Sequence, residues 1–182
     1  MSISRQNLSI VIVTFKSEGV IHECIKSIDK DIKITVVENS NNYQFKDELE
    51  KSYKNVSCVL SYENLGMGAG NNIGIKKAET DYVLILNPDV ILEPSTINEL
   101  IIASEKISNF AIIAPISSDI NYPNYKFKSN KKISIDYNLP FNVKSIDGFA
   151  MLFNKKQLDK TLNKNYFDEN FFMYLENDDL CK

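Results

Sequence analysis

The stretch Asn64–Leu92, NLGMGAGNNIGIKKAETDYVLILNPDVIL, contains the pattern that decides the fold. A glycine-rich loop opens it, residues 69–78 have the pattern of a short helix, and residues 82–86 form an apolar run typical of a buried strand. The run ends at Asn-Pro-Asp, so that Asp89 follows the carboxyl end of a rigid element. Glycines let the backbone approach a ligand closely, and an acid in this place suits a divalent cation. The stretch therefore predicts a nucleotide site in an α/β protein, with Asp89 as a metal ligand.

Alternating strand and helix patterns extend outward from this stretch through the first 114 residues. Repeated strand–helix units are typical of a parallel sheet whose connections cross over as helices. The chain is therefore predicted to be an α/β protein with a mostly parallel central sheet and helices on both faces. Strands are predicted at 8–14, 34–37, 56–60 and 110–114, and helices at 17–28, 41–52 and from 94 onward.

The pattern changes after Pro115, although no linker and no internal repeat separates the two parts of the chain. Strand-like patterns occur at 132–137, 143–146 and 149–153, and a helical pattern follows at 155–162. The chain then ends in an aromatic and acidic run, YFDENFFMYLENDDLCK. Since no boundary is visible, we expect a single domain over residues 1–182.

The composition argues against several classes of protein. The net charge is −3 and Arg5 is the only arginine, whereas nucleic-acid-binding proteins carry basic patches, so no nucleic-acid partner is expected. His22 is the only histidine, which argues against a Ser-His-Asp triad and a multi-histidine zinc site. The three cysteines lack metal-ligand spacing and are expected to be free thiols, two of them buried.

The sequence also predicts where the protein works in the cell. It begins without a charged and apolar leader of the secretory kind. No apolar run approaches the roughly 20 residues of a membrane-spanning helix. We therefore expect a cytoplasmic protein, and leave open its peripheral association with the inner face of the cell membrane.

Small polar or acidic groups follow the predicted strands where each strand ends. The carboxyl ends of parallel strands share one edge of the sheet, and ligands bind at that edge. Four such ends together are more informative than one, because every strand must end in some residue. The groups are Thr14 and Phe15, Glu38 and Asn39, Asn64 with the glycines, and Asn87 with Asp89.

Other interpretations exist for the glycines, for Asp89 and for the acidic residues near the C-terminus. A dinucleotide fingerprint places G-x-G-x-x-G after the first strand, whereas here G-x-G-x-G-x-x-x-G follows the third, so a dehydrogenase is not expected. The glycines can equally make a tight turn with close helix packing, and Asp89 can be a turn or capping acid. Likewise, Glu176, Asp178 and Asp179 either begin an acidic helix or include a general base whose pKa the neighbouring aromatic side chains raise.

Taken together, the motifs resemble the family 2 glycosyltransferases with the GT-A fold, specifically the rhamnosyltransferase-like branch that builds bacterial surface polysaccharides. The matching motifs run from Leu8 to the C-terminus in the family's order: SIVIVTF, VVENSNN, NLGMGAGNNIGI, LILNPDV, IDGFAMLFNK and YFDENFFMYLENDDLCK. The resemblance implies one GT-A-type catalytic domain, with a nucleotide-binding half at 1–114 and an acceptor and catalytic half at 115–182. It also implies that the C-terminal helices with which the family usually closes the acceptor side are truncated here.

The resemblance further implies roles for single residues. Asp89 would be the main ligand of Mg²⁺ or Mn²⁺, because Asn-Pro-Asp stands in place of the usual D-x-D motif. The catalytic base would come from Glu176, Asp178 or Asp179, which match the family's E-D-x-D element. The implied nucleotide-sugar-binding residues are Thr14, Phe15, Glu38, Asn39, Asn64, Gly66, Gly70, Asn71, Asn87, Asp89, Asp147 and Gly148.

Three residues depart from the family's pattern. Glu38 stands where an aspartate usually contacts the base, and its side chain is longer by one methylene. Asn87 removes one charge from the metal-binding motif. Asn177 occupies the second position of the E-D pair, and an amide cannot take up a proton, so the base falls to one of the neighbouring carboxylates.

The function implied by the resemblance is an inverting transfer of rhamnose or another hexose. The donor would be a dTDP- or UDP-sugar, and the acceptor a saccharide or lipid-linked saccharide. One alternative is a non-catalytic nucleotide-sugar-binding domain, which Asn87 and Asn177 would suit. The other is a sugar-nucleotide nucleotidyltransferase, although TFKSEGV after the first strand has one glycine and no arginine, unlike the basic glycine-rich loop of those enzymes.

Overall fold

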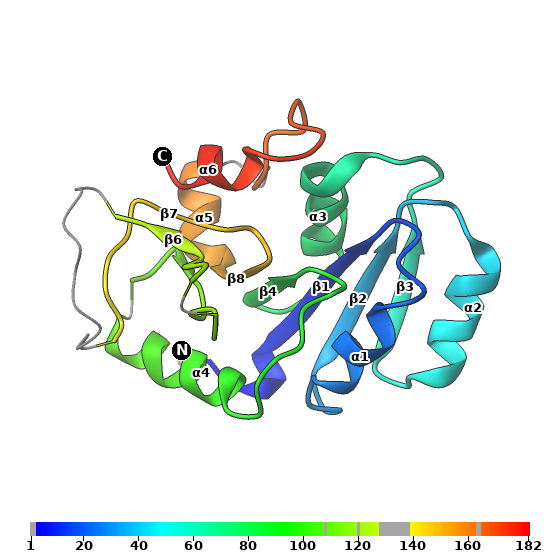
Figure 1. The fold of residues 1–182 in the computed structure, drawn as a ribbon, viewed down its shortest axis with the longest axis horizontal. Coiled ribbons are helices and arrows are strands. Elements are labelled where there is room, and N and C mark those ends of the chain that lie inside the picture. The colour runs from blue at the N-terminus through cyan, green and yellow to red at the C-terminus, as the bar shows by residue number, and fades with distance from the viewer. Residues whose placement is uncertain (1–2, 108, 120, 128–138, 163–164) are drawn as a thin grey trace.

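The computed structural model describes residues 3–107, 109–119, 121–127, 139–162 and 165–182 (Figure 1). Its main feature is a six-stranded sheet with the strand order β3-β2-β1-β4-β8-β5, and β6 and β7 pair as a separate small sheet. The strands are β1 Leu8–Thr14, β2 Lys33–Glu38, β3 Val56–Leu60, β4 Tyr82–Leu86, β5 Ile112–Ile113, β6 Tyr125–Lys126, β7 Ser145–Ile146 and β8 Ala150–Asn154.

The four strands β1 to β4 form the parallel part of the sheet. β1 pairs in parallel with β2 and with β4, and β2 pairs in parallel with β3. Every residue of β1 is buried, which suits its mostly β-branched sequence LSIVIVT. The predicted parallel sheet is confirmed, and the carboxyl ends of these strands lie along one edge.

β8, from the second half of the chain, separates β4 from β5. It pairs antiparallel with both, in register from Tyr82↔Asn154 to Leu86↔Ala150 on the β4 side. The strand predicted at 110–114 is correspondingly reduced to the two residues of β5, at the edge of the sheet. All of β8 is buried, whereas both residues of β5 are only partly buried at the edge of the sheet. Both halves of the chain thus share one sheet.

Helices cover both faces of this sheet, as the sequence predicts. Alternate residues of β1 face opposite sides: Ile10 and Ile12 belong to a core with α1, α2 and α4, whereas Val11 belongs to a second core with α3, α5 and α6. The helices are α1 Ile21–Lys26, α2 Tyr43–Ser52, α3 Gly66–Lys77, α4 Thr96–Lys106, α5 Lys155–Leu162 and α6 Glu176–Leu180, and a short 3₁₀ helix, η1, spans Arg5–Asn7.

Two helices, α1 and α3, differ most from their predicted starting residues. α1 begins at Ile21 and not at residue 17, because the chain first makes a turn in which the Val20 amide donates to the Ser17 carbonyl at 3.1 Å. α3 begins at Gly66, so the stretch predicted to be a glycine loop forms the first turns of a helix. Glycine disfavours helices by about 1 kcal/mol relative to alanine, and here tertiary packing overrides that preference.

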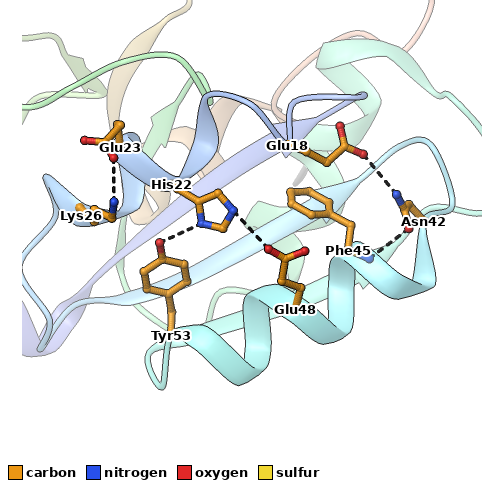
Figure 2. Close-up of polar contacts among 8 residues, drawn as sticks. All are labelled: Glu18, His22, Glu23, Lys26, Asn42, Phe45, Glu48 and Tyr53. Carbon is orange, nitrogen blue, oxygen red and sulfur yellow. Dashed lines mark hydrogen bonds and ion pairs between the residues drawn. The ribbon is translucent and has the colours of Figure 1, made fainter.

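Polar contacts join α1 to α2 on the surface (Figure 2). His22 Nδ1 lies 2.9 Å from the Tyr53 hydroxyl, and Nε2 lies 3.6 Å from Glu48 Oε1. Asn42 Nδ2 donates to Glu18 Oε1 at 3.2 Å, while Asn42 Oδ1 caps α2 by accepting from the Phe45 amide. The only histidine therefore joins two helices, and the Glu18 contact restrains the loop between β1 and α1.

Three remaining expectations have mixed outcomes. The predicted strand at 132–137 lies outside the described residues. Cys24 and Cys58 are buried free thiols as expected, and burial raises the pKa of each to about 12. Over the part of the chain that the structure describes, no helix is long and apolar enough to cross a membrane.

Candidate functional site

A cleft of about 650 Å³ lies at the carboxyl ends of β1 and β4, between α3 and the start of α6. It gathers the predicted residues Phe15, Asn71, Asn87, Asp89, Asp147, Gly148 and Glu176. A second cavity of similar size lies beside β5 and is lined mostly by apolar groups, with none of the predicted residues. We therefore take the cleft between α3 and α6 as the candidate site.

The glycines of α3 face the protein and not the cleft. A Cβ atom on Gly74 would overlap the Val11 side chain, and one on Gly70 would lie 2.8 Å from Val13 Cγ1, so both allow α3 to pack closely on β1. Gly66 has φ +80°, and a Cβ there would overlap the Phe172 carbonyl oxygen. The structural interpretation of these glycines is the one that the geometry supports, and the contact predicted for Gly66 and Gly70 with the diphosphate stays a prediction.

Asn71 and Asn72 are adjacent, both buried, and point to different partners. Asn72 Oδ1 accepts from the Phe167 amide at 3.0 Å, and its Nδ2 donates to the Phe167 carbonyl at 2.8 Å and to Glu169 Oε1 at 3.0 Å. Asn71 lines the cleft, and its buried Oδ1 has no hydrogen-bond partner among the described residues. Buried polar atoms are nearly always paired, so this oxygen is available to a ligand or a water molecule in the cleft.

Glu38 and Asn39 are buried behind the cleft. The Glu38 carboxylate accepts hydrogen bonds from the backbone amides of Ser40 and Asn42, at 2.9 and 2.6 Å, and from the Ser40 hydroxyl. Asn39 Nδ2 donates to the Gly66 carbonyl at 3.0 Å. The longer side chain of Glu38 therefore reaches its own loop. Contact of Glu38 with a nucleotide base, and of Asn39 with the nucleotide sugar, stays a prediction.

Thr14 and Asn64 also lie outside the cleft. Thr14 is fully buried, and its hydroxyl lies 3.4 Å from the Val37 carbonyl oxygen. Asn64 Oδ1 accepts from the Gly66 amide at 3.1 Å, before the first turn of α3. Both side chains therefore shape the edge of the sheet, while the exposed Phe15 ring lines the cleft itself.

The Asn-Pro-Asp turn follows β4 and presents Asp89 at the cleft. The turn is fixed by the Asn87 amide, which donates to the Phe149 carbonyl at 2.9 Å, and by the Val90 amide, which donates to the Asn87 carbonyl at 3.2 Å. Within the part of the chain that the structure describes, Asn87 Oδ1 is buried without a hydrogen-bond partner, whereas Asp89 is exposed. Asp89 is thus a free carboxylate on a rigid turn.

The three candidate bases on α6 have different surroundings. Asp178 pairs with Lys126, 3.1 Å away, and the hydrogen bond from Lys126 and a second from Ser145 hold the pKa of the Asp178 carboxyl below its usual range. Asp179 pairs with Lys182 at 3.0 Å. Glu176 lines the cleft, and its buried Oε2 meets no hydrogen-bond partner in the described ranges.

Asn177 fixes the orientation of α6. Its Nδ2 donates to the Ile146 carbonyl at 2.7 Å, and its side chain lies against Gly148. Asp147 precedes that glycine and lines the same cleft, with its amide donating to the Asn124 carbonyl at 2.8 Å. The amide side chain at position 177 therefore joins the turn that carries Asp147 to the helix that carries Glu176.

The charge of the cleft is entirely negative. Asp89, Asp147 and Glu176 line it, and none of its described lining residues is a lysine, arginine or histidine. Asn71 Oδ1 and Asn87 Oδ1 add two unpaired acceptor oxygens. The cleft therefore suits a ligand rich in hydroxyl donors, and an anionic ligand would need a cation beside it.

A divalent cation fits the donor set only together with a ligand. Among the described residues, no group of three or more histidine, cysteine, aspartate or glutamate side chains could hold a metal ion. Asp89 alone supplies a hard carboxylate oxygen at the strand end, with Asn87 Oδ1 behind it. Mg²⁺ is commonly held by one or two carboxylates plus substrate phosphates, and this arrangement matches the residues present.

Sequence reasoning missed several residues that line the cleft. Met67 is one turn before Asn71 on α3, Ser17 and Val20 come from the β1–α1 loop, and Met173 and Tyr174 precede α6. Only the helical spacing of Met67 and Asn71 could have indicated a shared face. The others are placed by turns whose geometry the residue types do not reveal.

Comparison with known proteins gives a family and several relatives. The model of the family described as "Glycosyl transferase family 2" matches residues 9–175. The low-salt glycan biosynthesis hexosyltransferase Agl10 of Haloferax volcanii is 27% identical over 191 residues, which cover 96% of this chain and 60% of Agl10. The rhamnosyltransferase WbbL of Escherichia coli is 25% identical over 198 residues, covering 94% of this chain and 74% of WbbL. The chain thus spans only part of the length of these relatives.

Solved structures show the same fold. The mannosyltransferase PcManGT of Pyrobaculum calidifontis, solved with GDP-Man and Mn²⁺, superposes with a TM-score of 0.70 at 12% identity. The match covers 97% of this chain and 51% of that protein. This likeness confirms the GT-A fold predicted from the sequence.

Proposed function

The chain belongs to glycosyl transferase family 2, and we propose that it carries out an inverting transfer of a hexose from a nucleoside diphosphate sugar to a saccharide acceptor. Rhamnose is the leading candidate for the sugar, with dTDP or UDP as its carrier. A lipid-linked saccharide of a bacterial surface polysaccharide is the leading acceptor, which would place the reaction at the inner face of the cell membrane. The rhamnosyltransferase and hexosyltransferase relatives support this choice.

The observation that carries the proposal is the set of oxygen atoms in the cleft. Three carboxylates and two unpaired amide oxygens converge there without a basic side chain among the described lining residues. Sugar hydroxyls are donors that such acceptors can satisfy. A carboxylate without a partner inside the cleft is in addition the group that a general base requires.

The donor diphosphate needs positive charge that the cleft itself lacks. We assign Asp89 as the carboxylate that would hold Mg²⁺ or Mn²⁺, with Asn87 behind it and the donor's phosphates completing the coordination. When bound, such a cation supplies Lewis-acid stabilisation of the charge that grows on the leaving nucleoside diphosphate. The mannosyltransferase of the same fold was solved with Mn²⁺ and its nucleotide sugar.

Glu176 is the base in the proposed reaction. Its carboxylate takes the proton of an acceptor hydroxyl, whose oxygen forms a bond to the anomeric carbon of the donor sugar. The bond from that carbon to the diphosphate oxygen breaks on the opposite face, and the nucleoside diphosphate leaves with the electron pair. The products are an inverted glycoside, a nucleoside diphosphate and the protonated Glu176. Asp178 and Asp179, which pair with lysines, are less suited to this role.

The test is donor consumption by the full-length protein with dTDP-rhamnose and a panel of UDP-hexoses, in the presence of Mn²⁺ or Mg²⁺. Asp89→Asn and Glu176→Gln are expected to lower kcat by about 10²-fold or more, since general base catalysis is worth roughly 10²–10⁴-fold. Glu93→Gln is the matched control, because Glu93 is exposed after the same strand and does not line the cleft. Unchanged turnover in both active-site variants contradicts the assignment.

Two other outcomes support the alternative functions. Donor binding that survives chelation of metal, with no turnover by the full-length protein, supports a non-catalytic nucleotide-sugar-binding domain. Release of pyrophosphate from a nucleoside triphosphate and a sugar phosphate supports a nucleotidyltransferase. The stereochemistry of the product, read by NMR from the anomeric coupling, separates inversion from retention.

A further inference from the structure

Tyr174 and Leu175 are two consecutive residues with left-handed backbone conformations, at φ 65° and 70°. Non-glycine residues adopt this conformation at an energetic cost, and such strain clusters at functional sites. Leu175 is the N-cap of α6, so the strain lies immediately before Glu176. The turn presents the side chain of Tyr174 at the cleft.

Large apolar side chains are exposed on this turn although the turn itself is well anchored. Tyr174 is 76% exposed, and the neighbouring side chains of Phe172, Met173 and Leu175 are also exposed. The Phe172 carbonyl accepts a hydrogen bond from the Met67 amide at 3.1 Å and lies directly against Gly66. A fixed turn with exposed apolar groups indicates a contact surface and not a loosely attached segment.

We propose that Tyr174, assisted by Met173, is a stacking platform for a pyranose ring of the acceptor saccharide, and that it brings an acceptor hydroxyl to Glu176. The proposal rests on the proposed function, which makes Glu176 the base. A base must lie within about 3 Å of the proton it removes, so the acceptor binds where Glu176 lies. Met173 and Tyr174 line that side of the cleft, whereas Asn71, Asn87 and Asp89 line the side of β4 and α3.

Ring chemistry gives the ligand class. The face of an aromatic ring carries partial negative charge, and one face of a pyranose presents C–H groups with partial positive charge. A tyrosine offers a large rigid contact area at a low cost in side-chain entropy. A saccharide therefore suits Tyr174 without the charged group that a phosphate ligand would require.

The local charge argues against a lipid surface as the partner. The run Asp168–Asp179, DENFFMYLENDD, contains five acidic residues and no lysine or arginine. Anionic lipid headgroups attract polybasic segments and repel acidic ones. An apolar turn set between acidic groups is thus better suited to a neutral sugar.

The first experiment uses the absence of tryptophan from residues 1–182. Tyr174→Trp introduces a single tryptophan, whose emission is separable from that of the remaining tyrosines, and preserves the platform. Tyr62→Trp is its matched control, because Tyr62 is 73% exposed, has φ 67° and does not line the cleft. Each variant is titrated with methyl α-rhamnoside, methyl α-mannoside and methyl β-glucoside in the presence of UDP or dTDP and Mn²⁺. A saturable change in emission is expected only at position 174, and no change there overturns the proposal.

The second experiment is kinetic. Tyr174→Ala should raise the acceptor KM by about fivefold or more while kcat and the donor KM stay within about twofold, and Tyr174→Phe should behave as the wild type. An unchanged acceptor KM overturns the proposal, as does weaker sedimentation of Tyr174→Ala with anionic phospholipid vesicles at an unchanged KM. If the wild type consumes no donor, the proposed function fails, and the fluorescence titration still decides whether Tyr174 binds a saccharide.

Discussion

The two helices that flank the cleft are held in place by different forces. α3 is a helix of 12 residues, eight of which are buried, and its glycines allow it to pack on β1. α6 has five residues, none of them fully buried: Leu180 packs partly against the second core, and the Asn177–Ile146 hydrogen bond and the Asp178–Lys126 ion pair fix the rest of the helix. One wall of the cleft thus depends on close packing and the other mainly on a few polar contacts.

Because of this difference, the two helices should contribute in different ways to the stability of the domain and to its function. Close packing transmits the cost of any added or removed atom to the whole domain. A polar contact at an exposed helix changes the free energy of unfolding little, although it still sets the position of the residue beside it. We therefore expect substitutions on α3 to be seen mainly in stability, and substitutions on α6 mainly in kinetics.

Gly66→Ala should have the largest effect. The new Cβ would overlap the Phe172 carbonyl oxygen and sit at a positive φ, and together these two terms destabilise by about 3–5 kcal/mol. For a protein of this size, Tm should fall by roughly 10 °C in thermal unfolding followed by circular dichroism.

Gly19→Ala is the matched control for this glycine. A Cβ added at Gly19 has no heavy atom within 4 Å, so Tm should change by less than about 2 °C. If Gly66→Ala unfolds at the wild-type temperature, the wall formed by α3 is not held by close packing.

Asn72→Ala compared with Asn71→Ala gives the next largest effect. Removing Asn72 leaves the buried amide and carbonyl of Phe167 without their partners, which should cost about 2–3 kcal/mol of unfolding free energy. Asn71 Oδ1 has no partner in the described part of the protein, so Asn71→Ala should cost less than about 1 kcal/mol and weaken donor binding instead.

Chemical denaturation and isothermal titration with UDP or dTDP and Mn²⁺ measure the two quantities. A loss of stability in Asn72→Ala together with weaker donor binding in Asn71→Ala would strengthen the distinction between packing and function in the two walls of the cleft. Equal losses of stability in both variants would contradict the role given to Asn71.

Asn177→Asp tests the wall of the cleft that α6 forms. The family pattern suggests that an acid here would supply a better base, whereas the structure predicts the opposite. A carboxylate cannot donate to the Ile146 carbonyl and would face that oxygen, so the turn carrying Asp147 should move away from α6. We expect kcat to fall about tenfold, which corresponds to about 1.4 kcal/mol of lost transition-state stabilisation.

The pH dependence of kcat distinguishes positioning from catalysis at this residue. If Asn177 only positions its neighbours, the apparent pKa of the basic group should stay that of the wild type while kcat falls. A rise in kcat, or a new limb in the pH profile, would show that position 177 takes up the proton. Asn177→Ala should lower kcat to a similar degree and so serves as the control for loss of the hydrogen bond.

Much of the parallel sheet could be predicted because its signals are local. Leu8–Thr14 and Tyr82–Leu86 are uninterrupted apolar runs, and their ends lie at one edge whatever the rest of the chain does. Asp89 and Glu176, which both line the cleft, could be proposed as site residues for the same reason, since each follows an element or run with a clear end. Two apolar runs, the predicted strand at 110–114 and β8, could each pair with β4, and the sequence pattern alone does not show that β8 does so.

The roles of the glycines and of Glu38 could not be predicted because they depend on neighbours distant in the sequence or on loop geometry. Whether Gly74 approaches a ligand or a side chain depends on Val11, which lies on another element. Glu38 turns toward Ser40 because one additional methylene lets its carboxylate reach its own loop. Tyr174 lines the cleft on a turn with two consecutive left-handed residues, a geometry that the residue types do not indicate.

Asp178→Asn should have the smallest effect, and it tests how the ion pair fixes α6. Lys126 lowers the pKa of Asp178 in the folded protein, so the stabilisation is present above the pKa of the unfolded chain and is lost as pH falls through the lower folded pKa. The variant should be less stable than the wild type by about 0.2–1 kcal/mol at pH 7, and equally stable in acid, where the wild-type carboxyl is protonated.

A double-mutant cycle with Lys126→Met, measured by urea denaturation at pH 7 and at high salt, isolates the pair. Since the side chain of Lys126 is mostly exposed, added salt should reduce the coupling. A coupling that persists in high salt and in acid would mean that α6 is held by packing after all, and the contrast between the two walls would then disappear.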